Sequence, residues 1–168
     1  MKVIFLDIDG VLYPCFQRKK TAYEPELLRK ICASRGLDVQ QIPDWDLCAV
    51  YSGWDKGAMM RLKRLIEHHN AVIVIESSWR YTRSLEELQR LFGLWGLQEA
   101  VVDITPLDAG FLKEPGIQEY LKNHRDIEAY VILDDIPMVE TFGIHAIRCP
   151  DIFDEECYQK ADRCLYGN

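Results

Sequence analysis

The first eleven residues contain an apolar run that ends in two aspartates separated by one residue. Val3–Leu6 are four consecutive branched or aromatic apolar residues, a pattern typical of a strand covered on both faces of a parallel sheet. Asp7 and Asp9 follow, and because alternate side chains of a strand emerge on the same side, their carboxylates repel each other. A hard divalent cation such as Mg²⁺, or protonation of one acid, would relieve this repulsion. Gly10 supplies the backbone freedom for a sharp turn out of the strand.

Further polar residues follow apolar segments in chain order. These are Ser77 and Ser78 after the strand 71–76, Lys113 at the start of a helix, and Asp134 with Asp135 after the strand 129–134. Pro115 suits the first turn of a helix, which is why Lys113 is expected at the helix start. Ligands of parallel α/β sheets bind beyond the carboxyl ends of the strands, so these groups are expected to converge there.

The apolar pattern along the whole chain alternates between strands and helices. Strands are expected at 2–8, 71–76, 100–104, 129–134 and 144–148, and helices at 24–35, 55–69, 84–94, 115–121 and 154–165. This alternation predicts an α/β fold, a three-layer Rossmann-like sandwich with a central, mainly five-stranded parallel sheet. With 168 residues and 48% hydrophobic content, residues 1–168 are expected to form a single domain.

The segment 37–54 is expected to be irregular, and it carries Pro43, Trp45, Tyr51 and Trp54. Two interpretations have equal weight: it forms a small lid or rim over the site, or its aromatic residues pack beneath a long loop. The stretch 104–113 is too short for an inserted domain. A small or absent cap is therefore expected, which leaves the site open to a phosphate presented on a large molecule.

The order of these parts resembles the haloacid dehalogenase-like (HAD) superfamily, whose four motifs are Asp-x-Asp, Ser or Thr, Lys, and a terminal acidic pair. The Ser-Ser-Trp-Arg and Val-Ile-Leu-Asp-Asp forms are most similar to the small HAD group associated with RNA repair proteins. The resemblance implies a phosphoric monoester hydrolase that uses Mg²⁺ and an aspartyl-phosphate intermediate. A lone Asp-x-Asp-Gly would be a weak signal, since it also occurs in calcium loops and at ordinary strand ends.

The resemblance also implies roles for five residues. Asp7 would be the nucleophile, and Asp9 the acid and base that protonates the leaving oxygen and then activates water. Ser77 would orient the phosphoryl oxygens, and Lys113 would neutralise charge on the nucleophile and the phosphate. Asp134 would complete a Mg²⁺ site with Asp7 and the backbone carbonyl of Asp9. A phosphate monoester is a dianion, so an anionic nucleophile needs this metal and lysine to screen the repulsion.

Other residues near the motifs keep alternatives open. Ser78 could replace Ser77 as the phosphate-binding hydroxyl, and both serines could simply cap the turn. Arg80 would contact phosphate or substrate, or pair with an acid at the turn. Asp135 is expected to lie behind the metal ligands and to support them without binding the ion itself. Lys122 is the weaker rival of Lys113, because it lies on a polar stretch of its helix.

Charge and cysteine content limit the partners. The net charge of −7, from 20 basic and 27 acidic residues, predicts no broad basic surface. The run Arg18–Lys20 is interpreted as a solvated loop, so RNA is disfavoured as a substrate but stays open beside small phosphate esters and phosphoproteins. Six scattered cysteines lack metal-ligand spacing, which argues against zinc. Without a signal peptide or membrane span, a cytoplasmic location is expected, and the oligomeric state is not predicted.

Two readings compete with the phosphatase. One is a binding or regulatory module that keeps the fold and metal site without turnover. The other is a nucleic-acid end-repair phosphatase, which would bind oligonucleotide termini in a salt-dependent way. Dependence of phosphoester hydrolysis on Mg²⁺ and on Asp7 distinguishes the enzyme from the binding module.

Overall fold

A computed structural model describes residues 1–16, 21–107 and 112–166 of the chain. The basic run Arg18–Lys20 lies outside the described residues. The elements in chain order are β1 (Lys2–Leu6), α1 (Pro25–Ser34), α2 (Asp44–Cys48), the π-helical turn η1 (Ala49–Gly53), α3 (Lys56–His69), β2 (Val72–Ile75), the 3₁₀ turn η2 (Ser78–Tyr81), α4 (Leu85–Gly93), the 3₁₀ turn η3 (Gln98–Ala100), β3 (Val101–Ile104), α5 (Lys113–Asn123), β4 (Ala129–Asp134), α6 (Val139–Phe142), the 3₁₀ turn η4 (Gly143–His145), β5 (Ala146–Arg148) and α7 (Glu155–Tyr166).

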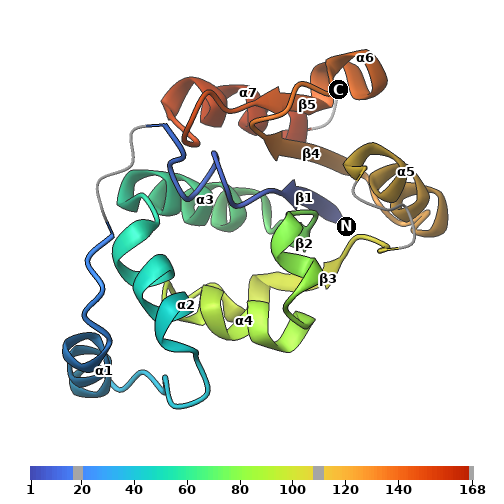
Figure 1. Cartoon of the computed structure of the whole chain (residues 1–168). Helices are drawn as coiled ribbons and strands as arrows, with labels where there is room; N and C mark the ends of the chain where they lie inside the picture. Colours follow the sequence, from blue (N-terminus) through green and yellow to red (C-terminus); the bar gives the residue numbers. More distant parts are fainter. Residues whose placement is uncertain (17–20, 108–111, 167–168) are drawn as a thin grey trace.

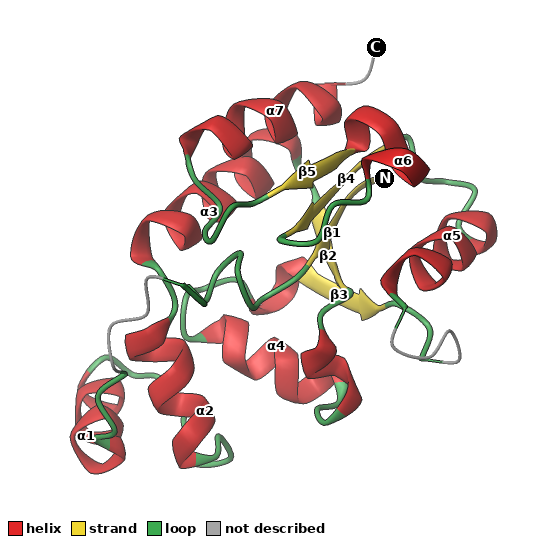
Figure 2. Cartoon of the chain, turned by 45° about the horizontal axis from the view of Figure 1, so that its top comes forward, coloured by secondary structure: helices red, strands yellow, loops and turns green. Residues whose placement is uncertain are grey.

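Across the described residues, the five strands form one parallel sheet in the order β3-β2-β1-β4-β5. The helices α3, α4 and α7 cover one face of this sheet, and α5 and α6 cover the other (Figures 1 and 2). The predicted three-layer Rossmann-like α/β fold is therefore confirmed. β1 lies at the centre of the sheet, so the residues that follow it emerge between its two neighbours β2 and β4.

Alternation of side chains along the strands produces two separate cores. Ile4 and Leu6 of β1 face the larger core beneath α3, α4 and α7. Val3 and Phe5 face the smaller core, where they meet α5 and α6. Because both faces are buried, the strands read as continuous apolar runs rather than as alternating ones.

The strands are mostly shorter than the sequence predicts. The first was expected at 2–8 but ends at Leu6, and the last was expected from 144 but begins at Ala146 after the 3₁₀ turn η4. Asp7 still donates its backbone N–H to the carbonyl of Leu133 at 3.0 Å, so the chain leaves the sheet with the direction of β1.

The irregular structure predicted for 37–54 is wrong in the second half of that segment. Asp44–Cys48 form α2, and the helix continues through the π-helical turn η1 to Gly53. Pro43 directly precedes α2, and Asp44 and Asp46 lie in its first turn, where acidic side chains favour the helix dipole. Figures 1 and 2 show α2 beside α1 at one end of the molecule, away from β4 and β5.

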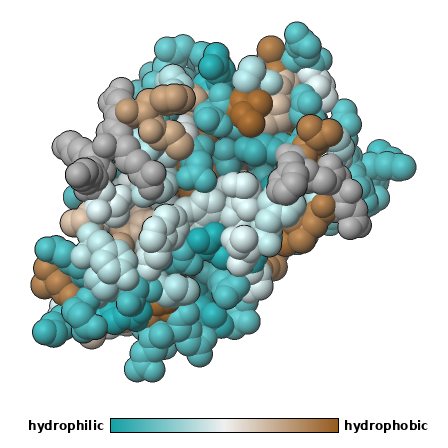
Figure 3. Space-filling view, in the orientation of Figure 1, coloured by the Kyte–Doolittle hydropathy of each residue, from teal (hydrophilic) through white to brown (hydrophobic). Residues whose placement is uncertain are grey.

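The outer surface is largely hydrophilic on the face seen in Figure 3, where hydrophobic residues form small separate patches. Among the described residues, none of the helices combines the length and the apolar character needed to cross a bilayer.

Candidate active site

Three of the predicted motifs meet at the carboxyl end of the sheet, where Lys113 connects them. Lys113 is the first residue of α5, and its Nζ lies 2.7 Å from Oδ2 of Asp7 and 2.7 Å from Oδ2 of Asp134. Asp7 follows β1, and Asp134 ends β4, the neighbouring strand. All three side chains are largely or wholly buried. One ammonium group thus pairs with carboxylates from two adjacent strands.

Asp135 adds a third carboxylate beside Asp7 and Asp134. Each of the three offers an oxygen, and these oxygens lie within 4.8 Å of one another. Asp134 has a well-defined orientation, because its Oδ1 accepts a hydrogen bond from the N–H of Ile136 at 2.8 Å while Oδ2 contacts Lys113. The acids outnumber the cation, and all the donors are carboxylate oxygens. This set fits Mg²⁺, which prefers oxygen ligands and requires neutralising charge.

Gly10 makes the close approach of Asp135 possible. Its φ of +75° lies in the left-handed region, and a Cβ atom there would lie 2.8 Å from the side chain of Asp135. The turn is closed by hydrogen bonds from the Gly10 N–H to the Tyr13 carbonyl and from the Tyr13 N–H to the Ile8 carbonyl, at 2.8 and 2.9 Å. The glycine thus serves both the turn and the acidic cluster.

Glu76 is a site residue that the sequence interpretation missed. It follows β2 directly, is fully buried, and has Oε2 3.6 Å from Nζ of Lys113. Burial and the neighbouring carboxylate of Asp134 raise the pKa of Glu76 well above its usual range. Asp7 and Asp134 contact the ammonium group more closely, at 2.7 Å, so Glu76 is the acid of the three that Lys113 neutralises least. An acid that directly continues a buried apolar run was the signal that could have found it.

Burial also sets the charges of the other members of the cluster. It opposes protonation of Lys113, but the carboxylates of Glu76, Asp7 and Asp134 outweigh this effect and raise the pKa of Lys113. Lys113 is therefore a permanent cation. Burial, followed by the charge of Asp7, raises the pKa of Asp134 to about 6. The raised pKa values of Glu76 and Asp134 favour uptake of protons by the cluster, and a bound cation would oppose this uptake.

Asp9 lies beside the aromatic side chain of Trp79. Nε1 of Trp79 donates a hydrogen bond to Oδ2 of Asp9 at 2.9 Å, and this indole is only 5% exposed. Trp79 itself is packed between Trp54 and Trp45, at ring distances of 6.1 and 5.9 Å. The carboxylate two residues after Asp7 is thus oriented by a rigid neighbour, and Trp79 was not among the predicted site residues.

The two serines have different environments. Ser77 is fully buried at the end of β2, and its Oγ accepts a hydrogen bond from the N–H of Trp79 at 3.5 Å. Ser78 begins η2 and is exposed. The pairing of β2 with β1 continues beyond Ile75, because the Glu76 N–H donates to the Leu6 carbonyl at 3.1 Å. Glu76 is therefore level with Asp7, and Ser77 lies one residue farther along the chain.

Arg80 is buried and binds backbone rather than an acid. Its Nη1 donates to the carbonyls of Glu76 and Ser77, the latter at 2.8 Å, and Nη2 donates to Oη of Tyr81 at 3.3 Å. Of the two interpretations offered by the sequence, pairing with an acid at the turn finds no support among these contacts. Arg80 instead holds the chain as it leaves β2, and so fixes the positions of Glu76 and Ser77.

Trp45 and Arg83 lie on the outer side of Trp79. Arg83 is held by two hydrogen bonds to Asp46 of α2, from Nε at 3.0 Å and from Nη2 at 2.7 Å, and its guanidinium carbon lies 4.2 Å from the centre of the Trp79 ring. Trp45 is half exposed, whereas Trp54 is buried against Phe92. Trp54 thus packs in the core, whereas Trp45 reaches the surface beside Trp79, and the lid or rim at 37–54 stays a prediction.

Comparison with known proteins agrees with this arrangement. The family model for the HAD domain in Swiss Army Knife RNA repair proteins matches residues 3–151, a range that includes all the acids, serines and the lysine described above. No curated protein matches the chain. HAD domains are generally hydrolases, and most are phosphatases. With its fold and motif order, the chain belongs to the family of HAD domains found in Swiss Army Knife RNA repair proteins.

Proposed function

We propose that this protein is a phosphatase that hydrolyses phosphate monoesters through a phosphoryl group carried on Asp7. The observation that carries the proposal is the position of Lys113, 2.7 Å from both Asp7 and Asp134. A buried ammonium group beside a buried carboxylate lets that carboxylate approach a dianionic phosphate. A module that only bound phosphate would gain nothing from placing a carboxylate there.

In the first half of the proposed reaction, an Asp7 carboxylate oxygen attacks phosphorus. The new bond joins this oxygen to phosphorus, the bond from phosphorus to the ester oxygen breaks, and Asp9 gives its proton to the leaving alcohol. In the second half, water attacks the same phosphorus and gives a proton to Asp9. The bond to Asp7 then breaks, which restores its carboxylate and releases inorganic phosphate.

The other residues bind and orient in this scheme. Ser77 would donate its hydroxyl to a phosphoryl oxygen, and Lys113 would offset the charge on Asp7 and the phosphate. Trp79 would hold the Asp9 carboxylate in place through the hydrogen bond from its indole nitrogen. Asp7, Asp134 and the backbone carbonyl of Asp9, with Asp135 adjacent, would hold Mg²⁺. That ion, when bound, supplies positive charge to the phosphoryl oxygens.

The test compares the parent chain with Asp7→Asn on a generic aryl phosphate, with Mg²⁺ and with EDTA. We expect hydrolysis by the parent only with Mg²⁺, and a loss of at least about 1,000-fold in Asp7→Asn. Mass spectrometry of the acid-quenched parent should find one phosphoryl group on Asp7. Asp126→Asn, which changes an exposed acid outside the site, is the matched control and should keep full activity. Turnover that survives Asp7→Asn, or absent turnover across varied phosphoesters, would overturn the proposal.

The end of a nucleic acid is the second candidate substrate, beside small phosphate esters and phosphoproteins. Half-exposed Trp45 and the guanidinium of Arg83 lie next to Trp79, which contacts Asp9. An aromatic ring and a guanidinium plane at this position could stack on a base beyond the phosphate. A panel of end-phosphorylated RNA, nucleotides, sugar phosphates and phosphotyrosyl peptides separates these substrates. Trp45→Ala should reduce kcat/KM for the RNA alone if RNA is the substrate.

A further inference from the structure

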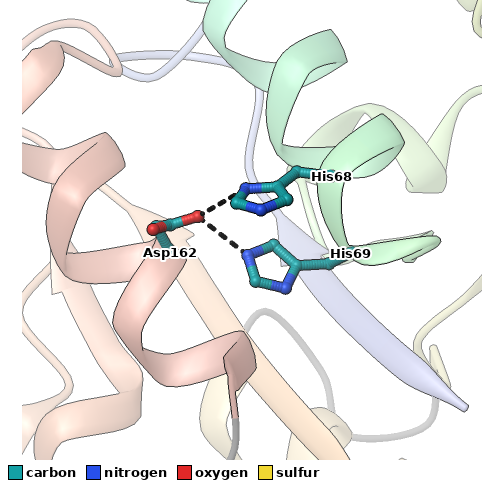
Figure 4. A group of neighbouring side chains, drawn as sticks. All are labelled: His68, His69 and Asp162. Carbon is teal, nitrogen blue, oxygen red and sulfur yellow. Dashed lines mark hydrogen bonds and ion pairs between the residues drawn. The ribbon is translucent and has the colours of Figure 1, made fainter.

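A second group of side chains that could hold a metal ion lies near the amino end of β2, at the opposite end of the strands from the carboxylate cluster. His68 and His69 end α3, and Asp162 belongs to α7 (Figure 4). α3 is followed at once by the start of β2, whereas Asp7 follows the end of the parallel strand β1. The group is therefore separated from the proposed active site by the length of the strands.

The two histidines point at the same oxygen atom. Nδ1 of His68 lies 3.1 Å, and Nε2 of His69 lies 2.8 Å, from Oδ1 of Asp162. Consecutive residues of a helix normally diverge by about 100°. Here the helix ends at Asn70, which has a left-handed φ of +50°, and the two imidazole rings lie 4.7 Å apart with their planes only 35° from parallel. Figure 4 shows both rings turned toward α7.

Tyr166 completes the surroundings of the two rings. Its hydroxyl lies 2.9 Å from Nε2 of His68, the ring nitrogen that points away from Asp162. The tyrosine ring also packs edge-on against His68 and His69, at centroid distances of 5.4 and 4.9 Å. A ligating histidine commonly hydrogen-bonds a supporting group through its other nitrogen, and Tyr166 occupies that position for His68.

Two imidazole nitrogens and one carboxylate oxygen are a ligand set that suits Zn²⁺. Ligands of a tetrahedral zinc ion with bonds of about 2.0–2.1 Å lie about 3.3 Å from one another. The present separations of 3.1 and 2.8 Å need to open by only a few tenths of an ångström. The carboxyl end of α3 carries a partial negative charge, which further favours a cation there.

Exposure of the group allows an ion to enter. The His69 side chain is 2% exposed, Asp162 is 23% exposed and His68 is 47% exposed, so the site has a buried floor and one open side. Asp162 also lies beyond residue 151, the end of the range that the family model matches. The three residues come together because α7 packs on α3. The long sequence separation between the histidines and Asp162 is not a recognisable metal-ligand spacing.

We propose that His68, His69 and Asp162 bind one Zn²⁺ ion, which links the end of α3 to α7 and leaves one coordination position for water. Nδ1 of His68 and Nε2 of His69 bind in their unprotonated forms, and Nε2 of His68 then donates its hydrogen to Oη of Tyr166. The bound ion would fasten α7 to the body of the domain. The proposal is independent of phosphatase activity.

Calorimetric titration of the full chain with Zn²⁺ tests this site, with excess Mg²⁺ present to occupy the carboxylate cluster. We expect one zinc ion per chain and a rise in melting temperature. His68→Gln changes an exposed ring, and Asp162→Asn keeps the shape of its side chain, so both variants should fold. Each should weaken zinc binding by at least about 100-fold, and Tyr166→Phe by about 10- to 100-fold. His124→Gln and His145→Gln, which remove the other two histidines, are the controls and should bind like the parent.

Three outcomes would overturn the proposal. The first is a parent chain that does not bind zinc under these conditions, in which case the His–Asp contacts are hydrogen bonds only. The second is unchanged binding in both His68→Gln and Asp162→Asn. The third is loss of zinc binding in Asp134→Asn, which would place the ion at the carboxylate cluster instead.

Discussion

At the scale of single residues, the unusual feature of this protein is the number of acids around one lysine. Asp7, Asp134 and Glu76 all lie within 3.6 Å of Nζ of Lys113. A buried ammonium group cannot satisfy three ionised carboxylates, so the cluster retains protons or takes up a cation. This competition between protons and metal gives the site its expected pH dependence.

Glu76 should make the metal-free protein less stable as pH rises. Its pKa is raised in the folded state, so above its ordinary pKa the folded chain binds more protons than the unfolded chain. The free energy of unfolding then falls with pH, by about 1.4 kcal/mol per pH unit for one proton, until the folded pKa is passed. Glu76→Gln mimics the protonated acid and should remove this slope. Urea unfolding in EDTA at several pH values, from about 4 to 8, measures the difference.

A stability difference between Glu76→Gln and the parent that stays constant across these pH values would contradict a raised pKa of Glu76 in the folded state. Burial, followed by the charge of Asp7, also raises the pKa of Asp134, to about 6. Because Asp134 and Glu76 interact, the comparison of the two proteins measures the titration of this pair of acids.

Trp79 is expected to act on catalysis through Asp9. Trp79→Phe keeps most of the packing but removes the hydrogen bond from Nε1 to the Asp9 carboxylate. Hydrogen bonds to charged groups contribute about 1.5–3 kcal/mol, so kcat should fall by about tenfold or more while Mg²⁺ affinity is unchanged. Trp54→Phe alters another ring packed on Trp79 and leaves this bond intact, so its kcat serves as the reference. Equal kcat values for the two variants would show that the bond does not orient Asp9.

At the scale of elements, the turn after β1 determines how closely two strand ends approach. Gly10 and Gly36 have nearly the same φ, at +75° and +72°, both in the left-handed region. A Cβ at Gly10 would lie 2.8 Å from Asp135, whereas a Cβ at Gly36 has nothing within 4 Å. Alanine substitutions at the two glycines therefore distinguish the cost of a left-handed φ from the cost of a steric contact.

Gly36→Ala should lower the free energy of unfolding by about 1 kcal/mol, the usual penalty for a left-handed alanine. Gly10→Ala should cost more than this, because Asp135 or the turn must move. It should also weaken Mg²⁺ binding by about tenfold or more, as loss of a supporting group commonly does. Urea unfolding and Mg²⁺ titration of both variants measure these effects. Equal changes in the two would mean that the contact with Asp135 does not matter.

At the scale of the whole molecule, the carboxylate cluster that we propose binds Mg²⁺ joins the two halves of the chain. Asp7 comes from the first strand and Asp134 from the fourth, so a bound cation links segments that separate on unfolding. A ligand that binds only the folded state stabilises it by mass action. The same argument applies to the zinc site proposed between α3 and α7, at the opposite end of the strands.

Mg²⁺ should therefore raise the free energy of unfolding of the intact chain, by about 2.7 kcal/mol at 100 times its dissociation constant. Thermal and urea unfolding with Mg²⁺ and with EDTA give this difference. Asp134→Asn should abolish it, whereas Asp126→Asn should leave it intact. The same increase in both variants would place the binding of Mg²⁺ elsewhere.

Sequence alone determined the order of strands and helices, because buried strands and amphipathic helices leave different periodicities. It also indicated that Asp7, Lys113 and Asp134 would converge, since residues that follow parallel strands meet at one edge of the sheet. It did not indicate α2, where a proline and several aromatic residues obscured a short helix that begins with two acids.

Only the tertiary structure decided which neighbours surround these groups. The sequence placed Glu76 at the end of a strand and assigned no role to Trp79. In the structure, Glu76 lies beside Lys113, and the indole nitrogen of Trp79 donates a hydrogen bond to Asp9. His69 and Asp162 are 93 residues apart and come together only because α7 packs on α3. Periodicity records which face of an element is buried, but a contact between side chains distant in sequence depends on how the elements pack in three dimensions.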